Sequence, residues 1–166
     1  MPVVVNGGTE DLLDRIVAEA LPSRRGEGAW RALLQAHATL LRRLATELVE
    51  ETGLTLGDFD VLVQLAEAGG ELRMTELAAR VYSSRSNLTR RIDRLVTEGI
   101  VRRTASGADA RGVVVALTDA GVNRLRETAP IHLRGVANLF VEPLSDEELA
   151  VLERALAKVS VDCTFG

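Results

Sequence analysis

The chain has 166 residues, enough for one domain of ordinary size or for a small domain with added oligomerisation helices. Hydrophobic residues make up 46% of it, which suffices for a packed core and argues against intrinsic disorder. Charge interrupts every apolar run well before the about 20 residues that a membrane span needs, and residues 1–8 lack the basic flank and long apolar region of a secretory signal. These features predict a cytoplasmic protein with no membrane partner.

Charge is unevenly distributed along the chain. The formal net charge is −4, yet residues 85–111 hold seven arginines against three acidic residues, a net +4 that leaves −8 on the remainder. A basic patch in an acidic frame is typical of a protein that contacts phosphates locally and repels DNA elsewhere. The distribution therefore favours a nucleic-acid partner despite the overall negative sign.

Helical periodicity predicts two helices in the first third of the chain. Residues 9–20 form a short amphipathic helix, and residues 29–51 form a longer one with leucines at three- and four-residue spacing. Proline and two glycines predict a loop over residues 21–28. The long helix has about 22 residues and a length of roughly 33 Å, more than a small core requires. We therefore expect residues 9–54 to provide dimerisation helices.

The next segment, residues 55–118, has the element order of a winged helix-turn-helix. Residues 55–58, TLGD, have the T-x-x-D form of a helix start, and the glycine pair at 69–70 ends that helix. A short helix over residues 74–81 follows. A fourth helix begins at a serine, Ser83 or Ser84, and runs to about residue 98 with most of its arginines away from its apolar face.

A β-hairpin is predicted directly after that helix. Residues 100–104 and 112–117 read as strands, and the segment between them, ASGADA, is rich in small and polar residues. The rest of the chain, residues 119–166, is predicted to be helical and to complete the dimerisation region. Pro130 should kink or split the first of these helices, and residues 145–148, SDEE, form a capping box for the last.

Two short helices followed at once by a basic hairpin predict a DNA-binding module. The major groove accepts an α-helix and displays a distinct pattern of donors and acceptors for each base pair. We expect the first turns of the arginine-rich helix to reach base edges or flanking phosphates, and the hairpin tip to reach the minor groove. The candidate DNA-binding residues are Ser84, Arg85, Ser86, Asn87, Thr89, Arg90, Arg94 and, at the tip, Arg111.

These segments resemble the multiple antibiotic resistance regulator (MarR) family. The matching runs are TELA at 75–78, LTRRIDRL at 88–95, EGIVRR at 98–103, DAR at 109–111, and VALT at 115–118 followed by Gly121. In element order the resemblance spans about residues 30–160. It implies a mainly α fold with a small β-hairpin wing, and a homodimer joined by its first and last helices.

The function that the resemblance implies is binding of a palindromic double-stranded operator, in most cases as a repressor. It makes Arg111 the wing-tip arginine and Asp109 the residue that orients the wing by pairing with a neighbouring base. Arg73 departs from the pattern, because the family usually places a threonine or serine there to cap the third helix. Arginine cannot cap in that way, so we expect this helix to start differently or to fray.

The resemblance also implies release from DNA by a small aromatic or anionic ligand bound between the dimer helices and the DNA-binding lobe. Trp30 and His37 fall on the apolar stripe of the long helix, where core or dimer packing explains them as well. The urate-responsive branch of the family carries an aspartate and two arginines that Asp60, Arg91 and Arg103 resemble, although residues 9–20 lack the tryptophan of that branch. Alternatively, Arg91 contacts phosphate and Asp60 pairs with a surface arginine. The further candidates are Arg42, Phe59 and His132.

The sequence argues against an enzyme, a cofactor and a metal site. It has no Ser/His/Asp or Cys/His arrangement and no glycine-rich phosphate loop, and its single cysteine, Cys163, excludes an internal disulfide. Cys163 is either a bystander or a redox-sensing thiol that crosslinks a dimer. Two other functions remain open, namely a winged helix used for protein contact and a DNA-binding regulator without a ligand.

Overall fold

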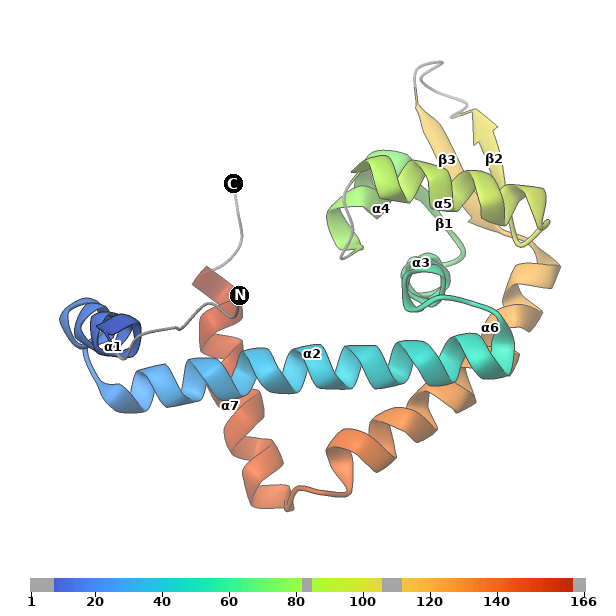
Figure 1. Ribbon diagram of the computed structural model, residues 1–166. Helices are drawn as coiled ribbons and strands as arrows, with labels where there is room; N and C mark the ends of the chain where they lie inside the picture. Colours follow the sequence, from blue (N-terminus) through green and yellow to red (C-terminus); the bar gives the residue numbers. More distant parts are fainter. Residues whose placement is uncertain (1–7, 82–84, 106–111, 163–166) are drawn as a thin grey trace, which may run out of the picture. The chain divides into compact units, whose positions relative to one another are not determined.

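The protein is mainly helical and carries one small sheet, as the computed structural model shows (Figure 1). The structure describes residues 8–81, 85–105 and 112–162. The chain divides into two units, residues 1–42 and 43–166, which are described separately. In chain order the elements are α1 (Gly8–Ala20), α2 (Arg24–Thr52), α3 (Leu56–Glu67), β1 (Glu71–Arg73), α4 (Met74–Arg80), α5 (Arg85–Thr97), β2 (Val101–Ala105), β3 (Val113–Leu117), α6 (Asp119–Val136), the π turn Ala137–Val141 and α7 (Asp146–Asp162).

The first unit holds α1 and the beginning of α2. The prediction of a loop over residues 21–28 was wrong, because α2 already begins at Arg24 and includes two glycines. The Ser23 hydroxyl accepts the Gly26 N–H at 3.1 Å, and Glu27 places an acid in the first turn. Both features stabilise a helix N-terminus and offset the poor helix propensity of glycine.

In the second unit, three antiparallel strands lie in the order β1-β3-β2. Strands β2 and β3 pair from Val101 opposite Leu117 to Ala105 opposite Val113, which confirms the predicted hairpin. Strand β1 was not predicted. It has only three residues, too few to display the alternation by which a strand is recognised, and its central Leu72 pairs with Val115 on the inner face. The mainly α fold with a β-hairpin wing is thus confirmed, with one added strand.

The core of this unit fixes the orientation of α5. The side chains of Leu88, Ile92 and Leu95 are completely buried, and they join leucines and valines of α3, α4 and the sheet in one cluster. Their spacing places them on one face of α5, so the remaining faces of the helix are available for polar contacts. None of the described helices is long and apolar enough to cross a membrane.

Two helix starts are defined by single hydrogen bonds. Thr55 caps α3, as the sequence predicts, and the Thr118 side chain accepts the Gly121 N–H at the start of α6. At α4 the backbone N–H of Arg73 donates to the Glu76 carboxylate at 3.1 Å. The Glu76 carboxylate therefore satisfies one of the two bonds of a capping box, and α4 starts directly after β1 although Arg73 has no acceptor to cap it.

The C-terminal helices follow the prediction with one exception. Of the two effects predicted for Pro130, a kink or a split, the split is wrong, because the chain stays helical through Pro130 and the irregular π turn begins only at residue 137. The capping box of α7 is confirmed, because the Ser145 N–H donates to Glu148 at 2.9 Å and the Glu148 N–H donates to the Ser145 hydroxyl. These bonds from the backbone and side chain of Ser145 lower the pKa of Glu148.

Gly121 generates the first testable prediction. A methyl group there would overlap the backbone carbonyl of Ile100, to which Thr118 is also bound, so neither group can yield easily. We expect Gly121→Ala to lower the free energy of unfolding by about 1–3 kcal/mol, as overpacking does elsewhere. Urea denaturation measures this value.

Gly28 is the matched control, because it lies inside α2 and a methyl group there meets nothing within 4 Å. Gly28→Ala should therefore raise stability by roughly 0.5–1 kcal/mol through better helix propensity. An unchanged unfolding midpoint for Gly121→Ala would contradict the close packing of α6 on the turn between α5 and β2.

Candidate nucleic-acid interface

Helix α5 presents the predicted DNA-contacting side chains that the structure describes. Asn87, Thr89 and Arg90 are all exposed in its first two turns. Ser84, Asp109 and Arg111 lie outside the described residues, as does Cys163. Arg85 and Ser86 begin α5, but their side chains also lie outside the described part. The exposed start of α5 is thus available for a partner.

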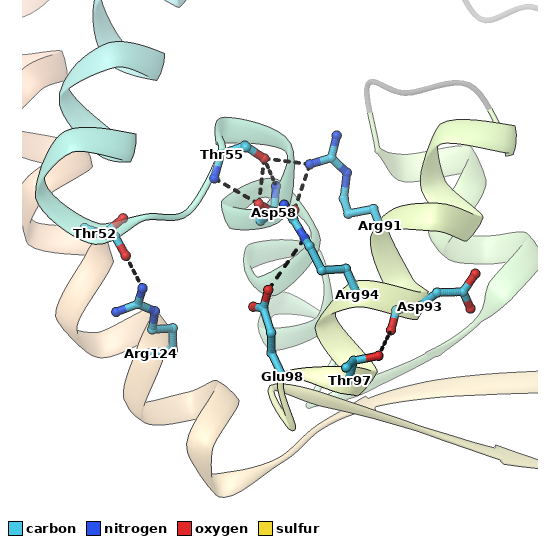
Figure 2. Close-up of polar contacts among 9 residues, drawn as sticks. All are labelled: Thr52, Thr55, Asp58, Arg91, Asp93, Arg94, Thr97, Glu98 and Arg124. Carbon is cyan, nitrogen blue, oxygen red and sulfur yellow. Dashed lines mark hydrogen bonds and ion pairs between the residues drawn. The ribbon is translucent and has the colours of Figure 1, made fainter.

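A buried carboxylate lies behind α5, in the first turn of α3. Asp58 is completely buried and accepts the N–H of Thr55 at 2.9 Å and the Thr55 hydroxyl at 2.7 Å (Figure 2). In return the Asp58 N–H donates to the Thr55 hydroxyl at 3.2 Å. This reciprocal pair is the capping box that the sequence predicts.

The same carboxylate binds two arginines of α5. Arg91 donates from Nη1 to Asp58 Oδ1 at 2.9 Å and to the Thr55 hydroxyl at 2.8 Å. Arg94 also pairs with Asp58 Oδ1, and its Nε lies 3.8 Å from Glu98 (Figure 2). We call Thr55, Asp58, Arg91 and Arg94 the Asp58 cluster. It binds two arginines of α5 to α3. One of them, Arg94, is a predicted DNA contact and keeps a side chain that is 46% exposed, and Arg90 is exposed as well.

Gly57 makes room for this cluster. A methyl group on Gly57 would overlap the guanidinium of Arg91, so Arg91 lies directly against the first turn of α3. The Arg91 side chain is only 21% exposed, and its Nε is buried without a hydrogen-bond partner among the described residues. Because an unsatisfied buried donor is costly, the bonds of Nη1 to Asp58 and Thr55 must outweigh that loss.

The pKa of Asp58 follows from these contacts. Burial raises it, but the side-chain and backbone hydrogen bonds from Thr55, together with Arg94, outweigh burial and lower the pKa below its ordinary value. Asp58 is therefore an anion at neutral pH. Its charge is balanced by two guanidinium groups, as a buried ion requires.

A second ion pair connects the wing to α5. Arg103 of β2 pairs with Asp93, an exposed acid of α5 that would otherwise repel phosphates. Asp60 accepts a bond from Gln64 Nε2 at 3.5 Å. The three residues predicted from the urate-responsive set thus have different bonding partners, namely Asp93 for Arg103, Asp58 and Thr55 for Arg91, and Gln64 for Asp60.

The remaining ligand candidates fall in both units. In the first unit, Trp30 is 57% exposed and His37 and Arg42 are exposed as well. In the second unit, the rings of Phe59 and His132 lie 4.7 Å apart between centroids, which joins α3 to α6. Burial lowers the pKa of His132, so the imidazole is neutral at pH 7. Among the described residues, no group of three His, Cys, Asp or Glu side chains could hold a metal ion.

The dual role of Asp58 was missed by sequence reasoning. The T-x-x-D spacing identified the cap but gave no sign of the two arginine partners, Arg91 and Arg94, which lie more than 30 positions further along the chain. Two features of the sequence are consistent with such a contact. Arg91 is a charged residue at the edge of the apolar face of its helix, and the helix that begins at residue 56 has a glycine, Gly57, at its second position.

Comparison with known proteins identifies the family of the chain. The MarR family model matches residues 52–112. The multiple antibiotic resistance protein MarR of Escherichia coli is 31% identical over 117 residues, which cover 70% of this chain and 81% of that protein. The chain belongs to the MarR family. Its relatives are transcriptional regulators, which confirms the prediction that the chain is not an enzyme.

Solved MarR-family structures share the fold over most of their length. Sco3205 of Streptomyces coelicolor, a regulator solved in complex with DNA, is 31% identical and superimposes with a TM-score of 0.81, covering 88% of this chain and 92% of that one. AbsC from the same organism is also 31% identical, with a TM-score of 0.78 and coverage of 86% and 96%.

The Asp58 cluster generates the second prediction. Asp58→Asn leaves two guanidinium groups without their anion, and we expect a loss of about 3 kcal/mol in the free energy of unfolding at pH 7. Because the folded-state pKa of Asp58 lies below its ordinary value of about 3.9, the stabilisation is complete above that pH and is lost as the pH falls through the folded-state pKa. Urea denaturation from pH 7 to pH 2 should show that Asp58→Asn removes this part of the acid sensitivity.

Asp119→Asn is the control, because Asp119 is an exposed aspartate in the first turn of α6. It should cost at most about 1 kcal/mol, the value of an acid near a helix N-terminus. Equal losses for the two variants would contradict the assignment of a special role to Asp58.

Proposed function

We propose that the chain is a homodimeric repressor that binds a palindromic operator with the first turns of α5 in the major groove. The observation that carries the proposal is the division of the α5 arginines. Asp58 binds Arg91 and Arg94, of which Arg94 stays 46% exposed, while Arg90 is exposed beside Asn87 and Thr89 and bonds to Asn87 instead. Sco3205, a relative of similar fold, was solved with DNA. In this proposal residues 55–118 form the DNA-binding lobe, and Arg111, oriented by Asp109, reaches the minor groove.

The proposed dimer rests on exposed apolar side chains of the helices that precede and follow that lobe in the sequence. Leu12 and Leu13 of α1 are more than half exposed, and so are Leu133 of α6 and Val151 of α7. A second copy of the chain would remove such surface from water. Residues 9–54 and 119–166 are accordingly the proposed dimerisation regions. Two-fold symmetry would place the two α5 helices about 34 Å apart, one helical turn of DNA.

DNA binding is tested by fluorescence anisotropy with the duplex upstream of the chain's own gene, a scrambled duplex, and two salt concentrations. The proposal predicts tight binding that prefers one duplex sequence and weakens steeply with salt, because phosphate contacts release counterions. If the upstream duplex is not preferred, selection from random duplexes locates the operator. Absence of binding to any duplex at low salt would contradict the proposal and favour the protein-contact function.

Arg90 provides the third prediction. Arg90→Ala removes an exposed cation from the proposed interface, so we expect roughly 5- to 150-fold weaker operator binding, the range for a good base contact. If Arg90 contacts phosphate instead, the slope of log K against log salt should fall by about 1. Melting temperature and dimer mass should not change, because Arg90 is exposed and its one described bond is to Asn87.

Arg126→Ala is the matched control, since Arg126 of α6 is an exposed arginine that also donates to an asparagine three residues earlier, Asn123, at 2.7 Å. Its loss should leave operator binding within about twofold of the wild type, because it lies outside the proposed DNA-binding lobe. Full affinity of a folded Arg90→Ala protein would remove α5 from the proposed interface.

The fourth prediction concerns the effector. We propose release from DNA by a small aromatic or anionic molecule, with Trp30, His37, Asp60, Arg91 and Arg103 as candidate contacts, and urate and salicylate as first probes. A ligand that binds only the folded protein stabilises it, by about 2.7 kcal/mol when the free ligand concentration is 100 times Kd, and therefore raises the melting temperature. The expected result is a higher melting temperature together with loss of anisotropy from the DNA complex. A probe that raises the melting temperature without releasing DNA would contradict its role as an inducer.

A further inference from the structure

Asn87 and Arg90 form a pair on the exposed side of α5. Arg90 donates from Nη2 to the Asn87 amide oxygen at 2.8 Å, one helical turn apart. Both side chains are exposed, whereas Leu88 between them is completely buried and fixes the rotation of the helix. The pair therefore lies within the first two turns of α5, on the part of the helix that would enter the major groove.

The bond to Arg90 sets the orientation of the Asn87 amide. A guanidinium carries donors and no acceptor, so it must face the amide oxygen and not the amide nitrogen. The NH₂ group of Asn87 is then directed away from Arg90. The pair thus offers donors from both residues, namely the Asn87 NH₂ and the remaining N–H groups of Arg90.

The only carboxylate on α5 is also occupied. Asp93 lies three residues after Arg90 on the same side of the helix, and its carboxylate pairs with Arg103 of β2. The two strongest acceptor groups of the described α5 side chains, the Asn87 oxygen and the Asp93 carboxylate, are therefore directed at arginines. Beside the donors of Asn87 and Arg90, this surface therefore presents one carboxylate whose charge is offset by Arg103.

We infer that Asn87 and Arg90 together read a guanine in each half-site of the operator, an inference that rests on the proposed DNA-binding function. In the major groove guanine offers two acceptors, N7 and O6, which match an all-donor pair. Cytosine offers a donor at N4 and is disfavoured. The bidentate recognition of adenine by asparagine uses the amide oxygen as an acceptor for N6. Arg90 already takes one of the two acceptor positions of that oxygen and places its own donors beside it, which disfavours the N6 amino group.

Selection of operators from a pool of random duplexes tests the inference with the full-length protein and two variants. Asn87→Asp keeps an oxygen for Arg90 but replaces the outward NH₂ donor with an acceptor. Asn123→Asp is the matched control. Asn123 accepts a hydrogen bond from Arg126, three residues later on α6, and the substitution changes the charge by the same amount. The wild type and Asn123→Asp should select the same motif with one strongly preferred guanine in each half-site.

Asn87→Asp should lose the preference at that guanine, in favour of a base with an exocyclic amino donor, and should keep the other positions of the motif. Asn87→Ala provides a second measurement that does not require a new preference. In competition binding, the wild type should discriminate roughly 5- to 150-fold against replacement of that guanine, and Asn87→Ala less than about twofold.

The outcomes distinguish a failure of the proposed DNA-binding function from a failure of guanine recognition by Asn87 and Arg90. If the wild type selects no motif, the proposed function fails and this inference fails with it. If the wild type selects a clear motif that Asn87→Asp and Asn87→Ala leave unchanged, or if the altered position is not a guanine, the inference alone is overturned. An unchanged motif would assign Asn87 and Arg90 to phosphate contact, which carries no sequence preference.

Discussion

The buried carboxylate of Asp58 joins the first turn of α3 to the middle of α5. It closes the capping box with Thr55 and at the same time binds Arg91 and Arg94. A buried anion is tolerated only when it is paired and hydrogen-bonded, so the carboxylate, the helix start and the two arginines depend on one another. The orientation of α5, and with it the exposed surface around Arg90, rests on this cluster and on the apolar face of the helix.

This arrangement divides the arginines that make residues 85–111 basic. Arg91 and Arg94 pair with Asp58, although Arg94 stays 46% exposed, Arg103 neutralises Asp93, and Arg90 is exposed with Asn87. A count of positive charge therefore overstates the number of unpaired cations. We propose that recognition belongs to a few exposed side chains at the start of α5, while the pairs with Asp58 keep the helix in place.

Features set by local spacing could be predicted from the sequence. The capping boxes at residues 55–58 and 145–148, the hairpin and the buried face of α5 each depend on neighbours within a few positions. Features that depend on distant partners could not. Strand β1 exists because Leu72 pairs with Val115, and the contact of Arg91 is determined by a carboxylate 33 positions away. The prediction of a loop over residues 21–28 failed because Ser23 caps a helix that its glycines alone would disfavour.

The positioning of α5 by the Asp58 cluster is best tested by the operator affinity of Asp58→Asn, measured by fluorescence anisotropy under conditions in which circular dichroism shows the variant to be folded. Removal of a negative charge from a DNA-binding protein should by itself strengthen its attraction to phosphates. The account predicts the opposite, at least tenfold weaker binding to the operator, because α5 loses the anion that holds it, while Asp119→Asn binds as tightly as the wild type or more tightly. Unchanged or tighter operator binding by folded Asp58→Asn would contradict the claim that the Asp58 cluster positions α5.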